Sequence, residues 1–148
     1  MCANFKPLKR EHSYQLDLLE PTFDYKSDVY PSDDCPIILS HQNEWEWRKV
    51  KFGMLPPYAK EVSFKYATYN ARTETVDHKR SFKHAWSNDQ FGLVPVEAIY
   101  EPNYINGKAH WYGIFRQDGK PFTLAAIYEE AIIDEQKVRT MSLLTINA

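Results

Sequence analysis

The chain has 148 residues and a formal net charge of −2, and 43% of its residues are hydrophobic and 15% aromatic, which is typical of one globular domain and excludes a disordered chain. No apolar run approaches the roughly 18 residues of a membrane-spanning helix, and the N-terminus lacks the apolar segment of a signal peptide. The two cysteines, Cys2 and Cys35, have neither the number nor the spacing of a disulfide framework or a zinc knuckle, so we expect a cytoplasmic protein with reduced thiols.

The charges are unevenly distributed along the chain. Residues 1–47 hold 4 Lys/Arg and 9 Asp/Glu, whereas residues 48–84 hold 9 Lys/Arg and 3 Asp/Glu. A basic segment in an otherwise acidic chain is a candidate contact for an anionic partner, and a solvated surface of mixed charge is the alternative. Tyrosines and phenylalanines interleave with the cations of this segment, as suits the unstacked bases of a single strand.

The first half of the chain predicts short elements separated by loops. Residues 11–20 have apolar residues near helical spacing and end before Pro21, so they predict a short helix. Residues 45–52 alternate with a two-residue period and predict a strand. The other expectations are loops at 22–35 and 52–61, a strand at 36–40 and a short helix at 81–87.

The second half predicts a sheet. Asn106–Gly107 and Asp118–Gly119 are the strongest hairpin signals in the sequence. They predict an antiparallel meander of strands at about 92–101, 109–116 and 121–128. Residues 138–148 predict a further strand, and because the chain stops there we expect its C-terminal part to be missing.

Cys2 is a candidate nucleophile. Removal of Met1, which is common before a small residue, makes Cys2 the first residue, with an amine and a thiol on adjacent carbons. Their usual pKa values of roughly 8 and 8.5 leave reactive fractions of both at neutral pH. An amine attacks an aldehyde to give a Schiff base, and the neighbouring thiol can then close a five-membered ring. An incidental terminal cysteine is the alternative.

An amide, a guanidinium and a carboxylate alternate in the segment 69–75, at Asn70, Arg72 and Glu74. In an extended chain these three side chains share one face. Arginine suits a phosphate through paired hydrogen bonds, and asparagine can hold a sugar oxygen or a carbonyl. The alternative is an exposed strand edge with an Arg72–Glu74 ion pair of little energetic value.

Glu101 is a candidate general acid or base, because it precedes Pro102 in a strand rich in aromatic residues. A solvent-facing strand residue is the alternative. The five histidines have no metal-ligand spacing, and no glycine-rich phosphate loop or Ser nucleophile motif is present. We therefore expect no metal, no cofactor and no membrane partner.

These residues together resemble the SRAP family (SOS response-associated peptidase domain), whose members shield abasic sites. The resemblance extends along the whole chain. It rests on the cysteine at position 2, the NAR-x-E-T motif at 70–75, and Glu101 on an aromatic strand followed by a DG turn. FGMLPP at 52–57, KRSFKHAW at 79–86 and DGKPFTLAAIYE at 118–129 give weaker support.

The resemblance implies a mainly β (α+β) fold, with a barrel-like antiparallel sheet and short helices in one SRAP-like domain over residues 1–148, incomplete at its C-terminus. It also implies covalent capture of abasic sites in single-stranded DNA during the SOS response, in the cytoplasm at the nucleoid. Cys2 forms a Schiff base and then a thiazolidine, Asn70 positions the sugar or the N-terminal residue, Arg72 holds a flanking phosphate, and Glu101 assists ring opening and proton transfer. The other expected DNA-binding residues are Tyr58, Lys60, Lys65 and Glu74.

The sequence departs from the family pattern in three places. Ala3 and Asn4 replace the Gly-Arg that usually follows the cysteine, which removes a phosphate contact, and the aromatic wedge of the cleft is reduced to Tyr58. The active-site histidine of the family follows the strand that 138–148 resembles and has no counterpart here. A catalytically impaired DNA-binding module and a thiol (auto)peptidase are therefore the alternatives. Missing strands would also expose a sheet edge, a site for self-association.

Overall fold

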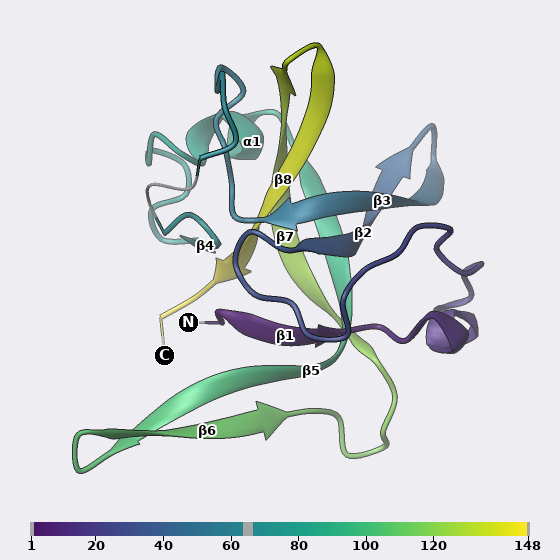
Figure 1. The fold of residues 1–148 in the computed structure, drawn as a ribbon, viewed down its shortest axis with the longest axis vertical. Coiled ribbons are helices and arrows are strands. Elements are labelled where there is room, and N and C mark those ends of the chain that lie inside the picture. Colours follow the sequence, from purple (N-terminus) through teal and green to yellow (C-terminus); the bar gives the residue numbers. More distant parts are fainter. Residues whose placement is uncertain (1, 64–66, 148) are drawn as a thin grey trace.

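Strands dominate the fold, which confirms the predicted mainly β class. The computed structural model describes residues 2–63 and 67–147 (Figure 1), so the predicted DNA-binding residue Lys65 lies outside the described residues. Within the described part, β5 pairs with β2, β2 with β3, β3 with β8, β8 with β7 and β7 with β5, which closes a barrel. The bounds of these strands are Asp34–His41 for β2, Glu44–Phe52 for β3, Phe91–Ile105 for β5, Phe122–Ile133 for β7 and Gln136–Thr145 for β8.

The barrel core includes one face of β2, a strand that is buried continuously from Cys35 to Leu39. Alternate residues of β2 (Cys35, Ile37, Leu39) are buried in one cluster, because successive side chains of a strand point to opposite faces. Phe52 at the end of β3 is fully buried, and its ring lies 5.2 Å from that of Phe5 in an edge-on contact. The core thus fixes the N-terminal segment against the barrel.

Three further strands extend the barrel towards the candidate site residues. β1 (Asn4–Pro7) pairs antiparallel with the middle of β5, and β4 (Asn70–Arg72) pairs parallel with the end of β8. β6 (Lys108–Ile114) pairs with the outer end of β5. The sequence analysis did not predict β1, because a strand of four residues is too short to show an alternating pattern.

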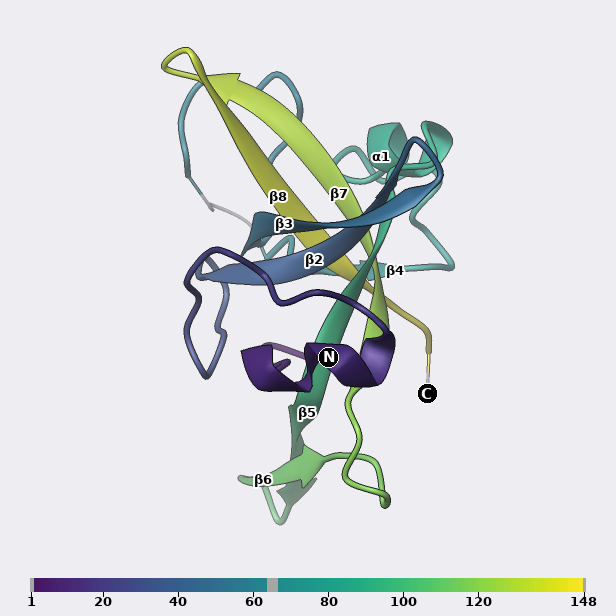
Figure 2. The ribbon, with the colours of Figure 1, turned by 90° about the vertical axis from the view of Figure 1, so that its right-hand side faces the viewer.

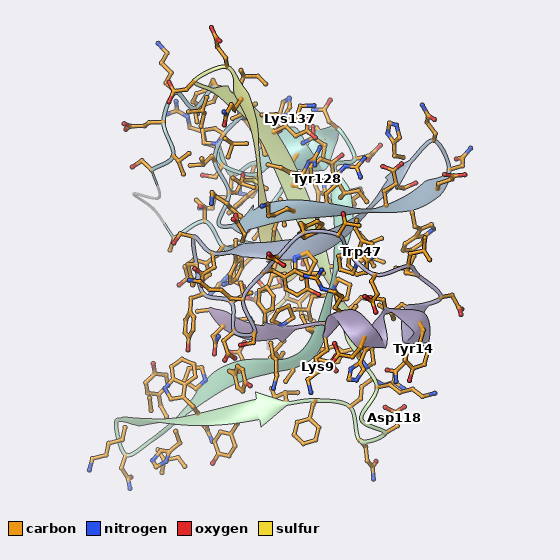
Figure 3. All side chains as sticks on the ribbon, turned by 45° about the vertical axis from the view of Figure 1, so that its right-hand side comes forward. Lys9, Tyr14, Trp47, Asp118, Tyr128 and Lys137 are labelled. Atoms are coloured by element: carbon orange, nitrogen blue, oxygen red, sulfur yellow. The ribbon has the colours of Figure 1, made fainter. Side chains whose placement is uncertain are left out.

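The predicted meander is wrong in its pairing. β6 pairs with residues 99–105 of β5 and β7 pairs with residues 91–96 of the same strand, so the two pair with different parts of β5. Asn106–Gly107 closes the β5–β6 hairpin with positive φ at both residues, as predicted. Asp118, labelled in Figure 3, lies in a turn between β6 and β7 that is not a hairpin, because these strands have no ladder in common.

Two hairpins have no glycine in their turns, so the sequence contains no hairpin signal for them. Gln42–Asn43 joins β2 to β3 and Asp134–Glu135 joins β7 to β8. All four residues have positive φ, between 50° and 65°, as the tight turns of β-hairpins require. The paired strands therefore impose on these residues a conformation that glycine adopts more readily.

The helical expectations are met by short elements. The predicted helix at 11–20 is a 3-10 helix, η1 (Arg10–Leu16), and it ends where Asp17 takes a left-handed conformation with φ of 55°. The short helix predicted at 81–87 is confirmed as α1 (Lys83–Ser87). In the part of the chain that the structure describes, no helix has the length and apolar character needed to cross a membrane.

The β5–β6 hairpin extends away from the barrel in both views of the ribbon (Figures 1 and 2). Every residue of β6 is exposed. Among the described residues β6 pairs with β5 alone, so its outer edge is open. Self-association through an exposed sheet edge stays a prediction.

Candidate functional site

Cys2 lies two residues before the start of β1, and the pairing of Asn4 with Tyr100 brings it alongside the middle of β5. Its side chain is only 6% exposed and belongs to the barrel core. The Sγ atom donates a hydrogen bond to the main-chain carbonyl of Asn4 at 3.4 Å. The thiol is therefore held in place rather than mobile at the chain end.

A pocket of about 410 Å³ opens beside Cys2. Two charged side chains of opposite sign, Arg72 and Glu101, line it together with Cys2. The rest of the lining comes from β5, β7 and the end of β8: Ile99, Leu124, Ala125 and residues 143–147. The structure thus brings a sulfur nucleophile, a cation and a carboxylate, far apart in sequence, to one cavity.

Asn70 positions Cys2 without itself lining the pocket. Its Nδ2 atom donates a hydrogen bond to the main-chain carbonyl of Cys2 at 2.9 Å. The segment before β4 is bound to β8, because the Leu143 N–H donates to the carbonyl of Tyr69 at 2.9 Å and the Ser142 hydroxyl donates to that of Thr68 at 2.7 Å. The sheet therefore fixes the amide that holds the N-terminal residue.

Two buried polar atoms near the pocket have no hydrogen-bond partner among the described residues. They are Oδ1 of Asn70 and Oγ1 of Thr145. A buried acceptor left without a partner costs about 1–3 kcal/mol, so such atoms are natural contacts for a bound molecule. Thr145 lines the pocket but was missed by the sequence analysis, and only its alternation with the buried Leu143 could have marked it.

The pKa of the Cys2 thiol is raised to about 11, chiefly by burial; the negative charge of Glu101 also raises it, and the hydrogen bond to Asn4 lowers it in part. The neutral thiol is therefore the dominant form at neutral pH. Burial also raises the pKa of the Cys35 thiol, whose side chain is fully buried in the barrel.

Glu101 and Arg72 enter the pocket from different strands. Glu101 lies on β5 directly opposite Tyr112 of β6. Arg72 ends β4, two residues after Asn70 and opposite Thr145 of β8. The two predicted residues on β4 thus share one strand face, as the extended pattern required.

Glu74 does not continue that face, so the predicted alternation ends at Arg72. The chain turns after β4, where the Thr75 N–H donates to the carbonyl of Arg72 at 3.1 Å. The Glu74 carboxylate accepts a hydrogen bond from the Asn147 N–H at 2.7 Å, and this bond lowers the pKa of Glu74. Glu74 therefore binds the C-terminal segment that lines the pocket.

Tyr58 and Lys60 line a different pocket, of about 590 Å³, in the loop after β3. The Arg80 guanidinium lies 5.7 Å from the centre of the Tyr58 ring and donates a hydrogen bond to its hydroxyl at 3.0 Å. The predicted DNA-binding residues are thus divided between two pockets, with Arg72 in one and Tyr58 and Lys60 in the other.

Within the described ranges, no group of three or more His, Cys, Asp or Glu side chains is placed to hold a metal ion. Nor does a described histidine line the Cys2 pocket. His84 is instead bound at 2.9 Å to the buried carboxylate of Glu129, which also accepts a hydrogen bond from Gln90.

The profile of the family described as SOS response associated peptidase (SRAP) matches residues 1–148. Abasic site processing protein YoaM of Bacillus subtilis is 25% identical over 120 residues, which cover 79% of this chain and 52% of YoaM. Abasic site processing protein YobE of the same species is 25% identical over 137 residues, which cover 90% of this chain and 62% of YobE. The chain thus spans little more than half the length of these curated relatives.

Solved structures share the fold. A protein of Bordetella bronchiseptica superposes with a TM-score of 0.91 at 28% identity, over 99% of this chain and 73% of that one. A protein of Bacteroides thetaiotaomicron superposes with a TM-score of 0.78 at 19% identity, over 99% of this chain and 68% of that one, which shows the fold alone. Because the family profile matches all 148 residues of this chain, the chain belongs to the SRAP family.

Proposed function

We propose that this chain, after removal of Met1, captures abasic sites in single-stranded DNA through Cys2. The observation that carries this proposal is the pocket in which Cys2, Arg72 and Glu101 meet, with Asn70 bound to the Cys2 carbonyl. The family and the names of the abasic site processing relatives support the choice of an abasic sugar as the electrophile.

The proposed reaction needs no oxidant and no cofactor. The α-amine of Cys2 adds to the C1′ aldehyde of the ring-opened sugar, and loss of one water molecule gives a Schiff base. The thiol sulfur then adds to the imine carbon, while the thiol proton passes to the nitrogen. A five-membered thiazolidine results, and the product equals protein plus DNA less one water.

The two charged residues of the pocket, and Asn70 outside it, each have a role in this reaction. The Glu101 carboxylate accepts a proton as the sugar ring opens and returns it as water departs. The Arg72 guanidinium binds a phosphate next to the abasic nucleotide. The Asn70 amide holds the Cys2 main chain, so that the amine and the thiol face one electrophile.

The ionisation of Cys2 indicates the order of the steps. Burial raises the pKa of the Cys2 thiol, so the thiolate is disfavoured at neutral pH, whereas an α-amine with its ordinary pKa of about 8 has a reactive neutral fraction. The amine therefore attacks first and the thiol closes the ring second.

A DNA-binding module that does not crosslink is the second candidate. The observation that favours it is the separate pocket of Tyr58, Lys60 and Arg80, where a ring and two cations lie apart from Cys2. This function needs no nucleophile and no removal of Met1, and its affinity falls steeply as salt is raised.

A denaturing gel separates the two candidates. The protein is incubated with a single-stranded oligonucleotide that carries one abasic site, and a band of protein linked to DNA is expected. Cys2→Ala abolishes this band, whereas Cys35→Ala, which removes the other, core-buried thiol, leaves it. An adduct that persists in Cys2→Ala contradicts capture through Cys2, and no adduct at all from protein with a free Cys2 amine contradicts capture altogether.

A further inference from the structure

We propose that one face of the β5–β6 hairpin binds the nucleotides that flank the captured abasic site, and that the Tyr112 ring stacks on the base nearest the pocket. This inference rests on the proposed function and extends it by naming a subsite. The hairpin face is the set of side chains on the pocket side of the two strands: Ile99, Glu101, Asn103, Ile105, Lys108, His110, Tyr112 and Ile114.

The strand register places these residues together. Residues directly opposite each other in an antiparallel pair share a face of the sheet. Glu101 is opposite Tyr112, and Ile99 is opposite Ile114. Because Ile99 and Glu101 both line the Cys2 pocket, the hairpin face begins at the pocket wall and continues outward from it.

The same register continues along the hairpin. Asn103 is opposite His110 and Ile105 is opposite Lys108. At about 3.3 Å per residue, the face extends roughly 13 Å from Glu101 to Ile105. A strand of DNA whose abasic sugar occupies the pocket can therefore lie along this face with its neighbouring nucleotides.

The exposure of the hairpin face suits base stacking. Tyr112 is 50% exposed, and Ile114 and Ile105 are 47% and 44% exposed. Side chains project from both sides of the hairpin (Figure 3). An exposed ring beside apolar side chains offers a platform for an unstacked base, and every base presents a flat face to it.

The charge of the hairpin suits the phosphates of the same strand. Residues 102–117 contain Lys108 and Arg116 and no Asp or Glu. The Arg116 guanidinium is bound to Asp118 in the turn after β6. The hairpin therefore presents no carboxylate beyond Glu101, and Lys108 at its tip supplies a positive charge.

The opposite face of the hairpin provides matched controls. Tyr104 and Trp111 lie there, because they alternate with the residues of the hairpin face. Tyr104 is 70% exposed, and it lies on the same hairpin as Tyr112. Tyr104→Ala therefore removes an aromatic ring of the same size as that of Tyr112 and leaves the hairpin face unchanged.

Reversible binding to a single-stranded oligonucleotide with one tetrahydrofuran residue tests this subsite. That analogue of the abasic sugar has no aldehyde, so its affinity, measured by fluorescence anisotropy, does not depend on covalent capture. Tyr112→Ala is expected to weaken binding about 5- to 100-fold, as loss of one stacked base predicts. Tyr112→Phe retains the affinity, and Tyr104→Ala leaves it unchanged.

Lys108→Ala is expected to reduce the slope of log affinity against log salt by roughly 0.7, which corresponds to one phosphate contact with a single strand. Circular dichroism shows whether each variant is folded, and Tyr112→Leu, which keeps apolar bulk without a ring, repeats the test with a smaller change of volume.

The subsite is overturned if folded Tyr112→Ala and Tyr112→Leu bind as tightly as the wild type, if Tyr104→Ala weakens binding as much as they do, or if the wild type does not bind the analogue. A wild type that binds the analogue through Tyr112 but forms no adduct with a true abasic site contradicts the proposed capture alone. The two failures are therefore distinguishable.

Discussion

The side-chain amide of Asn70 donates a hydrogen bond to the main-chain carbonyl of Cys2 at 2.9 Å. This bond joins the short strand β4 to the first described residue of the chain, across 68 positions of sequence. Because β4 is itself held by β8, the bond ties the position of the candidate nucleophile to the barrel.

Loss of this bond is expected to lower the rate of adduct formation while the protein stays folded. Asn70→Ala removes one hydrogen bond worth about 0.5–1.5 kcal/mol, and the rate of adduct formation should fall roughly 2- to 10-fold. The rate is measured on denaturing gels and the stability by urea unfolding. Asn88→Ala, which removes a similar bond to the carbonyl of His84 on an exposed helix end, should leave the rate unchanged; an equal loss there contradicts the role of Asn70.

The reactivity of the Cys2 thiol is expected to rise with pH. Burial raises its pKa from 9.0 to about 11, so the folded state favours the neutral thiol. The stability that this preference contributes is complete below pH 9 and is lost as pH rises towards 11. Alkylation of Cys35→Ala protein by iodoacetamide, followed by intact mass, should accelerate steadily from pH 7 to pH 10; a rate that levels off by pH 10, as for a thiol with an unshifted pKa, contradicts a buried thiol.

Removal of Met1 shifts this profile in a defined direction. The new α-ammonium lies next to the thiol and favours its anionic form, so the pKa of the Cys2 thiol should fall. Protein that lacks Met1 should therefore be alkylated at lower pH than protein that retains it. Identical profiles for the two forms would show that the amine and the thiol do not interact.

The stability of the site depends on Phe52. Its ring contacts that of Phe5 and lies 5.7 Å from that of Tyr69, the residue before Asn70. Phe52→Ala should cost about 3–5 kcal/mol because it leaves a cavity, and Phe52→Leu should cost less. Urea unfolding measures both, and a cost below 1 kcal/mol for the alanine variant would contradict the packing described here.

Arg72 is expected to contribute to DNA binding through charge. Arg72→Ala should lower the salt dependence of single-stranded DNA binding by roughly 0.7 in the log–log slope. Lys137→Ala is the control, because Lys137 lies at the β7–β8 hairpin, apart from the Cys2 pocket (Figure 3). If both substitutions change the slope equally, the charge of Arg72 acts only through the overall field of the protein.

Some local signals of the sequence predicted local structure correctly, whereas Asp118–Gly119 predicted a hairpin that does not form. Asn106–Gly107 predicted its hairpin because both residues adopt positive φ at little cost. The strand at 45–52 was visible because its residue types alternate with a two-residue period, although burial alternates only at its end, at Val50 and Phe52. Gln42–Asn43 and Asp134–Glu135 adopt the same turn conformation without glycine, so their hairpins depend on the pairing of the flanking strands and left no local signal.

The site required information beyond local pattern. The closure of the barrel depends on the parallel pairing of β3 with β8, in which Phe52 is opposite Met141. No local pattern in the sequence predicts that two residues so far apart will pair. The family resemblance named Cys2, Asn70, Arg72 and Glu101 but not their mutual geometry. Thr145 joins the pocket because it is opposite Arg72 in the pairing of β4 with β8.

Capture through Cys2 is best tested by the intact mass of the protein before and after reaction with an abasic-site oligonucleotide. We expect a starting mass that lacks Met1 and a product mass equal to protein plus oligonucleotide less one water, and we expect no such product from Cys2→Ala. A product that forms while Met1 is retained, or an adduct mass without the loss of water, would contradict capture through the amine and thiol of Cys2.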